Sequence, residues 1–215
     1  MKVVVLGLWH LGCVTAACSA KFVDVVGLDF DASVVEDLRA GKQPVFEPGL
    51  ADLIQDRVVS GHLAFESDPS NALADADLLW VTYDTPVDDD DKADVKPVLE
   101  GIDRCMPYLR GEALVLISSQ VPAGTCRLLE EKYPGRRFAY SPENLRLGKA
   151  IEIFLHSERI ILGTRREEDA ECLSQLLGHF STNILRVCPE SAEMIKHAIN
   201  SFLALSITFM NEIAR

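Results

Sequence analysis

The sequence predicts an α/β protein with a doubly wound, mostly parallel sheet and a long C-terminal helix. Two observations predict this fold. Strand-like and helix-like segments alternate along almost all of the 215 residues, which is typical of a parallel sheet covered by helices. The last segment, 190–214, is apolar on nearly every face, as in a helix that packs against a large partner surface.

The expected elements follow from apolar periodicity and from the Pro and Gly residues at the joins between segments. Short apolar runs predict strands near residues 2–7, 23–29, 62–65, 78–82, 113–117, 137–140, 159–162 and 183–187. Longer periodic segments predict helices near residues 10–20, 31–40, 49–59, 95–108, 124–133, 166–179 and 190–214. No internal repeat and no low-complexity linker interrupts this order.

The beginning of the chain has the parts of a dinucleotide site in the required order. Lys2–Leu6 is a β-branched run typical of a buried parallel strand. A glycine turn follows at the start of a helix, and the second strand ends on Asp29, which lies 22 residues after Gly7. Glycine permits the sharp turn, the helix N-terminus attracts pyrophosphate, and the acid binds ribose hydroxyls. We therefore predict a Rossmann-type cofactor site at Gly7, Trp9, His10, Leu11, Gly12 and Asp29.

Two features compete with this interpretation. Trp9 occupies the place of the second glycine of the GxGxxG pattern, where phosphate comes closest to the backbone. Residues 1–20 also resemble a signal peptide or lipoprotein site, because one basic residue precedes an apolar stretch with a small-residue end. Gly7, His10 and Gly12 interrupt that apolar stretch, so the nucleotide turn is favoured.

The composition excludes several classes of protein. The net charge is −12, from 21 basic and 33 acidic residues, which disfavours binding to nucleic acid or to anionic membranes. No 18-residue apolar run predicts a transmembrane span. The six cysteines lack zinc-type spacing, which is typical of a protein in the reducing cytoplasm. We interpret the acidic run 88–91 as a solvated loop and expect no metal site.

Polar residues of the segment 190–214 lie on one narrow stripe. Glu193, Lys196, Asn200 and Asn211 fall within about 25° of one direction at about 100° per residue. We interpret the segment as a buried helix that lines a polar cleft, and the alternative is a salt-bridged surface stripe. Either interpretation requires a partner for the remaining faces of this helix.

Seven motifs, in order between Lys2 and Ala214, resemble those of the UDP-glucose/GDP-mannose dehydrogenase family. They are Gly7-Leu8-Trp9-His10-Leu11-Gly12, Pro44-Val45-Phe46-Glu47-Pro48-Gly49-Leu50, Thr85-Pro86 with Ala93-Asp94-Val95, Val121-Pro122-Ala123-Gly124-Thr125, Ser141-Pro142-Glu143-Asn144-Leu145-Arg146, Ser157-Glu158-Arg159-Ile160-Ile161-Leu162-Gly163, and Ala192-Glu193 through Asn211-Glu212-Ile213-Ala214. The second is similar to the family's Pro-Ile-Tyr-Glu-Pro-Gly-Leu, and the fifth to its Asn-Pro-Glu-Phe-Leu-Arg.

The resemblance implies an NAD-dependent, four-electron oxidation of the C6 alcohol of a nucleotide sugar to a carboxylate. It assigns Gly7, Gly12 and Asp29 to the cofactor, with Thr85 and Thr125 close to it. We expect NAD rather than NADP, because the Asp29 carboxylate would accept hydrogen bonds from a ribose 2′-hydroxyl and repel a 2′-phosphate.

The resemblance further implies that Glu143, Lys196 and Asn200 face the sugar and its reacting oxygen. Lys196 would stabilise developing negative charge as a fixed cation. The residues alone allow simpler roles. Glu143 is then a surface cap, and Lys196 forms an ion pair with Glu193 one helical turn away.

The resemblance also implies a domain organisation. Residues 1–188 correspond to the NAD-binding domain, and residues 189–215 to the start of a central helix through which the family forms dimers. The family's catalytic cysteine, which forms a thiohemiacetal and then a thioester, and its uridine-binding C-terminal domain correspond to later segments that these 215 residues do not contain. We therefore expect a homodimer through residues 190–214 and no oxidation by this chain alone.

Three positions depart from the family pattern. Asp84 replaces a glycine, Gln120 replaces a threonine, and Leu147 replaces a second glutamate. Gln120 and Leu147 together weaken the water-activating groups of the family and suggest altered chemistry or substrate. Two alternatives to a dehydrogenase fragment therefore stay open: a non-catalytic nucleotide-binding module, and a two-electron dehydrogenase of the 6-phosphogluconate or hydroxyacid kind.

Overall fold

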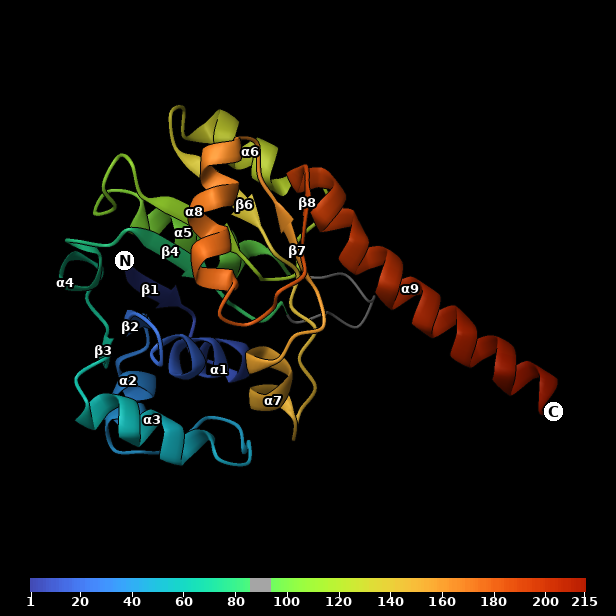
Figure 1. Cartoon of the computed structure of the whole chain (residues 1–215), viewed down its shortest axis with the longest axis horizontal. Coiled ribbons are helices and arrows are strands. Elements are labelled where there is room, and N and C mark those ends of the chain that lie inside the picture. Colours follow the sequence, from blue (N-terminus) through green and yellow to red (C-terminus); the bar gives the residue numbers. More distant parts are fainter. Residues whose placement is uncertain (86–93) are drawn as a thin grey trace.

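A computed structural model describes residues 1–85 and 94–215 and confirms the Rossmann-type α/β fold (Figure 1). The acidic run 88–91 lies outside the described residues. The sheet has the order β3-β2-β1-β4-β5-β6-β7-β8, and all neighbouring strands are parallel except β6 and β7. The strands are β1 (Lys2–Leu6), β2 (Asp24–Leu28), β3 (Leu63–Glu66), β4 (Leu78–Val81), β5 (Leu114–Ile117), β6 (Arg137–Tyr140), β7 (Ile160–Gly163) and β8 (Ile184–Val187).

Two of the helices, α4 and α7, were not predicted from the sequence. With five and six residues, they are too short to show a helical period. Asp68 nevertheless gives α4 a regular start, because its carboxylate accepts a hydrogen bond from the backbone N–H of Ser70. The helices are α1 (His10–Ser19), α2 (Ala32–Arg39), α3 (Leu50–Val59), α4 (Pro69–Leu73), α5 (Lys96–Cys105), α6 (Thr125–Lys132), α7 (Ala150–Leu155), α8 (Glu167–Leu177) and α9 (Pro189–Ile213).

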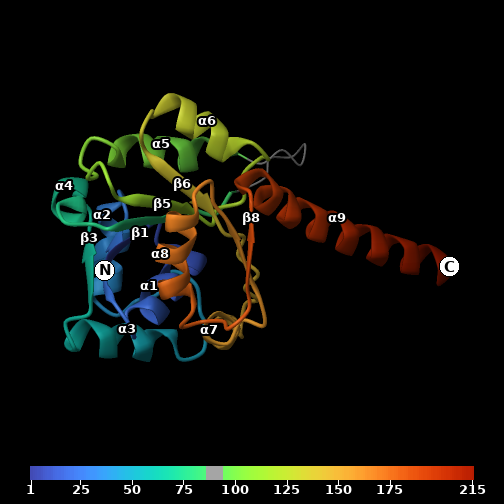
Figure 2. The same ribbon diagram turned by 45° about the horizontal axis from the view of Figure 1, so that its top comes forward.

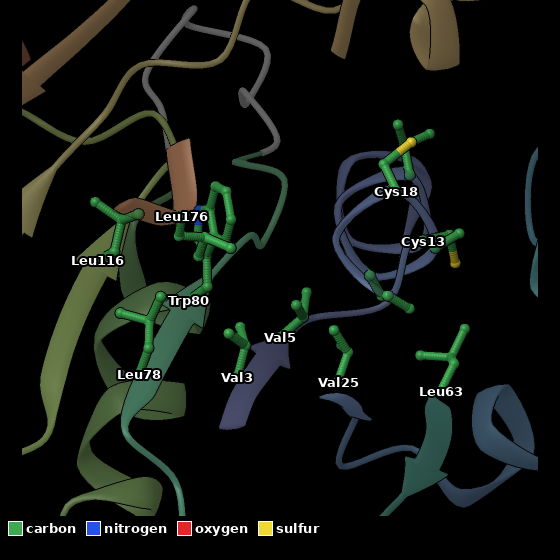
Figure 3. Close-up of a cluster of buried hydrophobic side chains, with 14 of the residues drawn as sticks. Val3, Val5, Cys13, Cys18, Val25, Leu63, Leu78, Trp80, Leu116 and Leu176 are labelled. Carbon is green, nitrogen blue, oxygen red and sulfur yellow. The ribbon is translucent and has the colours of Figure 1, made fainter. Parts of the chain in front are cut away.

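Helices cover both faces of the sheet, so its central strands are apolar on both sides. Val3 and Val5 of β1 pack into one core with α1, α3 and α8, whereas Val4 and Leu6 pack into a second core with α4, α5 and α6. Figure 3 shows the first core, with Cys18 of α1 in the layer above the strands. Because successive side chains of a strand point to opposite faces, the central strands contribute side chains to both cores.

Residues 1–20, which resemble a signal peptide in sequence, form the centre of this fold. β1 lies between β2 and β4, and its Val3–Leu6 segment is fully buried. α1 is buried along almost its whole length, because it packs against the sheet and contacts α3 and α7. The apolar character of this segment is therefore accounted for by the core.

Helix α9 begins in the domain and then projects away from it (Figures 1 and 2). Pro189, Ala192 and Glu193 are buried, but the side chains from Ile199 onward are mostly exposed. The prediction of a buried, cleft-lining helix is therefore correct only for the first turns, and Asn211 lies on the exposed part. Among the described residues, no helix is both long and apolar enough to cross a membrane.

Candidate functional site

The turn between β1 and α1 has the backbone geometry of a phosphate-binding turn. Gly7 has φ = 92°, a conformation that glycine adopts at little cost. A Cβ atom at Gly12 would lie 1.8 Å from the Gly7 carbonyl oxygen, so only glycine allows α1 to start this close to the turn. Trp9 is the N-cap residue of α1 and is half exposed. The first N–H groups of a helix have no intrahelical acceptor and favour an anion at this end.

Asp29 follows the end of β2 and faces this turn. Its Oδ2 accepts a hydrogen bond of 2.8 Å from the Leu8 backbone N–H, and its Oδ1 accepts one of 3.0 Å from the Asp31 N–H. Each carboxylate oxygen has a second lone pair, so ribose hydroxyls can still donate to Asp29. The two backbone bonds hold the carboxylate in position before a ligand binds.

His10 connects the turn to a buried carboxylate. Its Nε2 lies 3.0 Å from Oε2 of Glu47. The same Oε2 accepts a hydrogen bond from the Gly148 N–H (2.8 Å), and Oε1 accepts one from the Ala150 N–H (2.9 Å). Burial opposes ionisation of Glu47, but the bonds from His10, Gly148 and Ala150 outweigh it and lower the pKa of the carboxyl. Glu47 therefore joins the start of α1 to the segment around α7.

A polar pocket of about 160 Å³ lies at the carboxyl ends of β4 and β5. Ser119 is buried, and its hydroxyl has no hydrogen-bond partner among the described residues, so a ligand in the pocket can satisfy it. The neighbouring Ser118 accepts a 2.9 Å hydrogen bond from the indole N–H of Trp80. The lining residues are Leu11, Tyr83, Asp84, Thr85, Ser118, Ser119, Gln120, Glu143 and Lys196.

Glu143 and Lys196 meet in this pocket. The Lys196 ammonium donates to the Glu143 backbone oxygen at 2.7 Å and lies 3.5 Å from its Oε1, while Oε2 of Glu143 accepts from the Leu145 N–H at 2.6 Å. Glu143 is thus a local cap as well as a pocket residue. Glu193 does not pair with Lys196; it accepts hydrogen bonds from the backbone N–H groups of Gly124 and Cys126.

The other predicted site residues lie nearby with different surroundings. Thr85 lines the pocket. The Thr125 hydroxyl donates to the Pro122 carbonyl oxygen at 2.6 Å at the start of α6. Asn200 is exposed and is not among the described residues that line the pocket. Its Nδ2 lies 3.5 Å from Oε1 of Gln120, which does line the pocket.

Of the three departures from the family pattern, Asp84 and Gln120 line the pocket, whereas Leu147 is exposed elsewhere. Three further lining residues, Tyr83, Ser118 and Ser119, were not predicted from the sequence. Their positions in the sequence could have predicted them, because each follows the carboxyl end of a central strand within two residues. Ligands bind at these strand ends in open α/β sheets.

No cysteine is among the described residues that line the pocket. Burial raises the pKa of Cys13, Cys18 and Cys105 to about 12, so these thiols stay protonated at neutral pH. Cys188 is exposed at the N-terminus of α9, and its hydrogen bonds with Ser191 lower the pKa of its thiol.

The arrangement fits a dinucleotide that crosses the sheet. The glycine turn and the start of α1 lie between β1 and β4, where the strand order reverses, and Asp29 lies on the β2 side of this point. The pocket with the unpartnered Ser119 hydroxyl lies on the β5 side, and Leu11 of α1 forms part of its lining. Polar groups are therefore available to both ends of a dinucleotide, Asp29 at one end and the pocket at the other.

Comparison with known proteins decides the family. A model of the NAD binding domain of the UDP-glucose/GDP-mannose dehydrogenase family matches residues 1–181. The chain belongs to this family. NAD is thus confirmed as the cofactor of this domain, and the resemblance inferred from the seven motifs is correct.

Individual relatives agree with the family assignment. UDP-glucose 6-dehydrogenase YwqF of Bacillus subtilis is 33% identical over 222 residues, covering 100% of this chain and 50% of the relative. A UDP-glucose dehydrogenase structure from Pyrobaculum islandicum has a TM-score of 0.90 and 34% identity, and the match covers 99% of this chain and 52% of that chain. A ternary complex of GDP-mannose dehydrogenase from Pseudomonas aeruginosa has a TM-score of 0.90 and 26% identity. The match covers 99% of this chain and 52% of that chain. This chain therefore spans about half the length of these UDP-glucose/GDP-mannose dehydrogenases.

Proposed function

We propose that this chain is the NAD-binding part of a nucleotide-sugar 6-dehydrogenase, which oxidises the C6 alcohol of a UDP- or GDP-linked sugar to the carboxylate. The observation that carries the proposal is the polar pocket beside the cofactor turn, where Glu143 and Lys196 converge from the β6 loop and α9. In the same proposal, the protein acts in the cytoplasm as a homodimer, and its substrate is a nucleotide sugar.

The pocket residues divide the work of positioning and charge stabilisation. NAD, when bound, accepts the hydride that leaves the sugar. The Lys196 ammonium has three N–H donors and uses one of them on the Glu143 backbone oxygen, so another can donate to an oxygen of the sugar. A fixed cation at that point stabilises negative charge that develops on the oxygen during oxidation. Glu143 holds the ammonium in place through its backbone.

Glu193 supports this geometry from one turn earlier on α9. Its buried carboxylate binds the N–H groups of Gly124 and Cys126 and so anchors the helix to the start of α6. Since Lys196 lies on the next turn, the hydrogen bonds of Glu193 fix where along α9 the Lys196 ammonium reaches the pocket. In this proposal Glu193 is a positioning residue, and Lys196 and Glu143 touch the substrate.

The proposal is tested by adding the half of the protein that relatives have and these 215 residues do not. We expect no NADH from the chain alone with UDP-glucose or GDP-mannose, because no thiol lies in the described pocket lining. Fusion to the C-terminal half of a family member should restore NADH production. A chain that oxidises these sugars after all six cysteines are replaced would contradict the proposed mechanism.

In the active fusion, Lys196→Ala should lower kcat by roughly 100-fold, about 3 kcal/mol, as for the loss of one oxyanion donor. Lys132→Ala is the matched control, because Lys132 pairs with Asp103 on the surface, away from the pocket. Equal activity of the two variants would remove Lys196 from the reaction.

A non-catalytic NAD-binding module is the second candidate function. One observation favours it, namely that Gln120, which replaces a threonine of the family pattern and weakens its water-activating groups, lines the pocket. In that case the fusion binds NAD with unchanged affinity but forms no NADH, a result that separates the two functions.

A further inference from the structure

Asp84 is a pocket carboxylate at a position where the family pattern has glycine. It follows β4 by three residues and lines the polar pocket with Glu143 and Lys196. Although part of its surface faces solvent, partial burial raises the pKa of the Asp84 carboxyl, and the Glu143 charge raises it further, against the opposing effect of His10. Asp84 thus shares one pocket with the Glu143 carboxylate and the Lys196 ammonium.

The position of the pocket on the sheet indicates which end of NAD lies beside Asp84. The turn before α1 takes the pyrophosphate, and Asp29 on the β2 side takes the adenosine ribose. The other half of the dinucleotide must then extend across β4 and β5, and the pocket lies at the ends of these strands with Leu11 of α1 in its lining. The nicotinamide half therefore lies next to Asp84.

The charges of the pocket do not cancel. Asp84 and Glu143 supply two negative charges, and Lys196 is the one basic side chain among the described lining residues. His10 is outside this lining and is paired with the Glu47 carboxylate. A ligand group with a positive charge therefore gains more in this pocket than a neutral group of the same shape.

We propose that Asp84 makes the site selective for the oxidised cofactor. The nicotinamide ring carries a positive charge in NAD⁺ and none in NADH, while the rest of the molecule is the same. The Asp84 carboxylate stabilises the charged ring and leaves the neutral ring unaffected, so it favours NAD⁺ binding and NADH release. A glycine at this position, as in the family pattern, would supply no such charge. The inference rests on the placement of the nicotinamide half, not on the identity of the sugar.

The test is the ratio of the Kd for NADH to the Kd for NAD⁺, measured by calorimetry on the 215-residue chain at low salt. Asp84→Asn keeps the shape of the side chain and removes its charge. We expect the ratio to fall about fivefold, as for two unit charges about 4 Å apart that interact through water, because Asp84 is partly exposed. The fall should shrink at high salt, because the carboxylate is partly exposed. Asp75→Asn is the matched control, since Asp75 is an exposed carboxylate that precedes the amino end of β4, whereas Asp84 follows its carboxyl end.

The outcomes separate this inference from the proposed function. An unchanged ratio in Asp84→Asn overturns the inference, even when both affinities fall equally, because that result describes a hydrogen bond and not a charge effect. An equal change in Asp75→Asn also overturns it, since net charge would then be the cause. The measurement involves no oxidation of a sugar, so a failed activity assay does not affect it.

Discussion

At the scale of single residues, the site depends on carboxylates that backbone N–H groups hold in place. Asp29, Glu47, Glu143 and Glu193 each accept hydrogen bonds from backbone N–H groups. Such bonds to an ionised group are stronger than neutral ones and fix its orientation. In a chain with a net charge of −12, the pyrophosphate of the cofactor depends instead on the free N–H groups at the start of α1.

The Asp29 carboxylate should set the choice of NAD over NADP. Wild type is expected to bind NAD more tightly, because a 2′-phosphate next to Asp29 is repelled. Asp29→Ala should weaken NAD about tenfold, in line with the loss of a hydrogen bond to a charged group, and should remove the discrimination against NADP. Calorimetric titration with both cofactors measures this, with Asp37→Ala on the surface of α2 as control. Tighter binding of NADP to wild type would contradict the role of Asp29.

At the scale of elements, α9 is the part whose surface is not accounted for by its own domain. Its exposed apolar side chains include Phe202, 73% exposed, and Phe209, 60% exposed, and both figures show the helix projecting from the sheet (Figures 1 and 2). Apolar patches of several hundred Å² are rare on monomers. The polar stripe likewise changes role along α9, because Glu193 and Lys196 meet the domain and Asn211 does not.

We expect the chain to self-associate through α9 with like surfaces facing each other. Phe202→Asp or Phe209→Asp should shift the mass measured by light scattering at micromolar concentration toward the monomer. Val59→Asp is the control, because Val59 is an apolar residue that is 82% exposed but lies at the end of α3 and not on α9. A wild-type monomer that neither α9 variant changes would show that another element covers this helix.

At the scale of the whole molecule, Glu47 connects segments that are far apart in the sequence. It binds His10 of α1 and the backbone of Gly148 and Ala150, about a hundred residues away. Its folded-state pKa is lowered, so its contribution to stability is present above the unfolded pKa and is lost as the pH falls through the folded value.

Chemical unfolding at several pH values tests this role of Glu47. Glu47→Gln should reduce the free energy of unfolding at pH 7 by about 2 kcal/mol, since hydrogen bonds to a buried charge are lost. The difference from wild type should decrease as the pH falls below the unfolded pKa of about 4.3 and through the lowered pKa of the folded state. Glu152→Gln, an exposed change on α7, should leave stability nearly unchanged. A constant difference at all pH values would show that the charge of Glu47 is not the cause.

The sequence by itself determined the strands, the sheet class, the cofactor turn and the family. Buried parallel strands require continuous apolar runs, such as Val3–Leu6, and a turn that must approach a helix start requires glycine at Gly7 and Gly12. These are local requirements, so they leave local patterns. The short helices α4 and α7 left no helical period, because they have only five and six residues.

The tertiary structure alone decided which polar groups face one another. Glu193 binds the α6 loop and not Lys196, and Asp84, Ser119 and Lys196 meet in one pocket although they come from three separate segments. It also showed that α9 is buried only in its first turns. Contacts of this kind depend on how distant segments pack across the sheet, and no spacing within one segment records that packing.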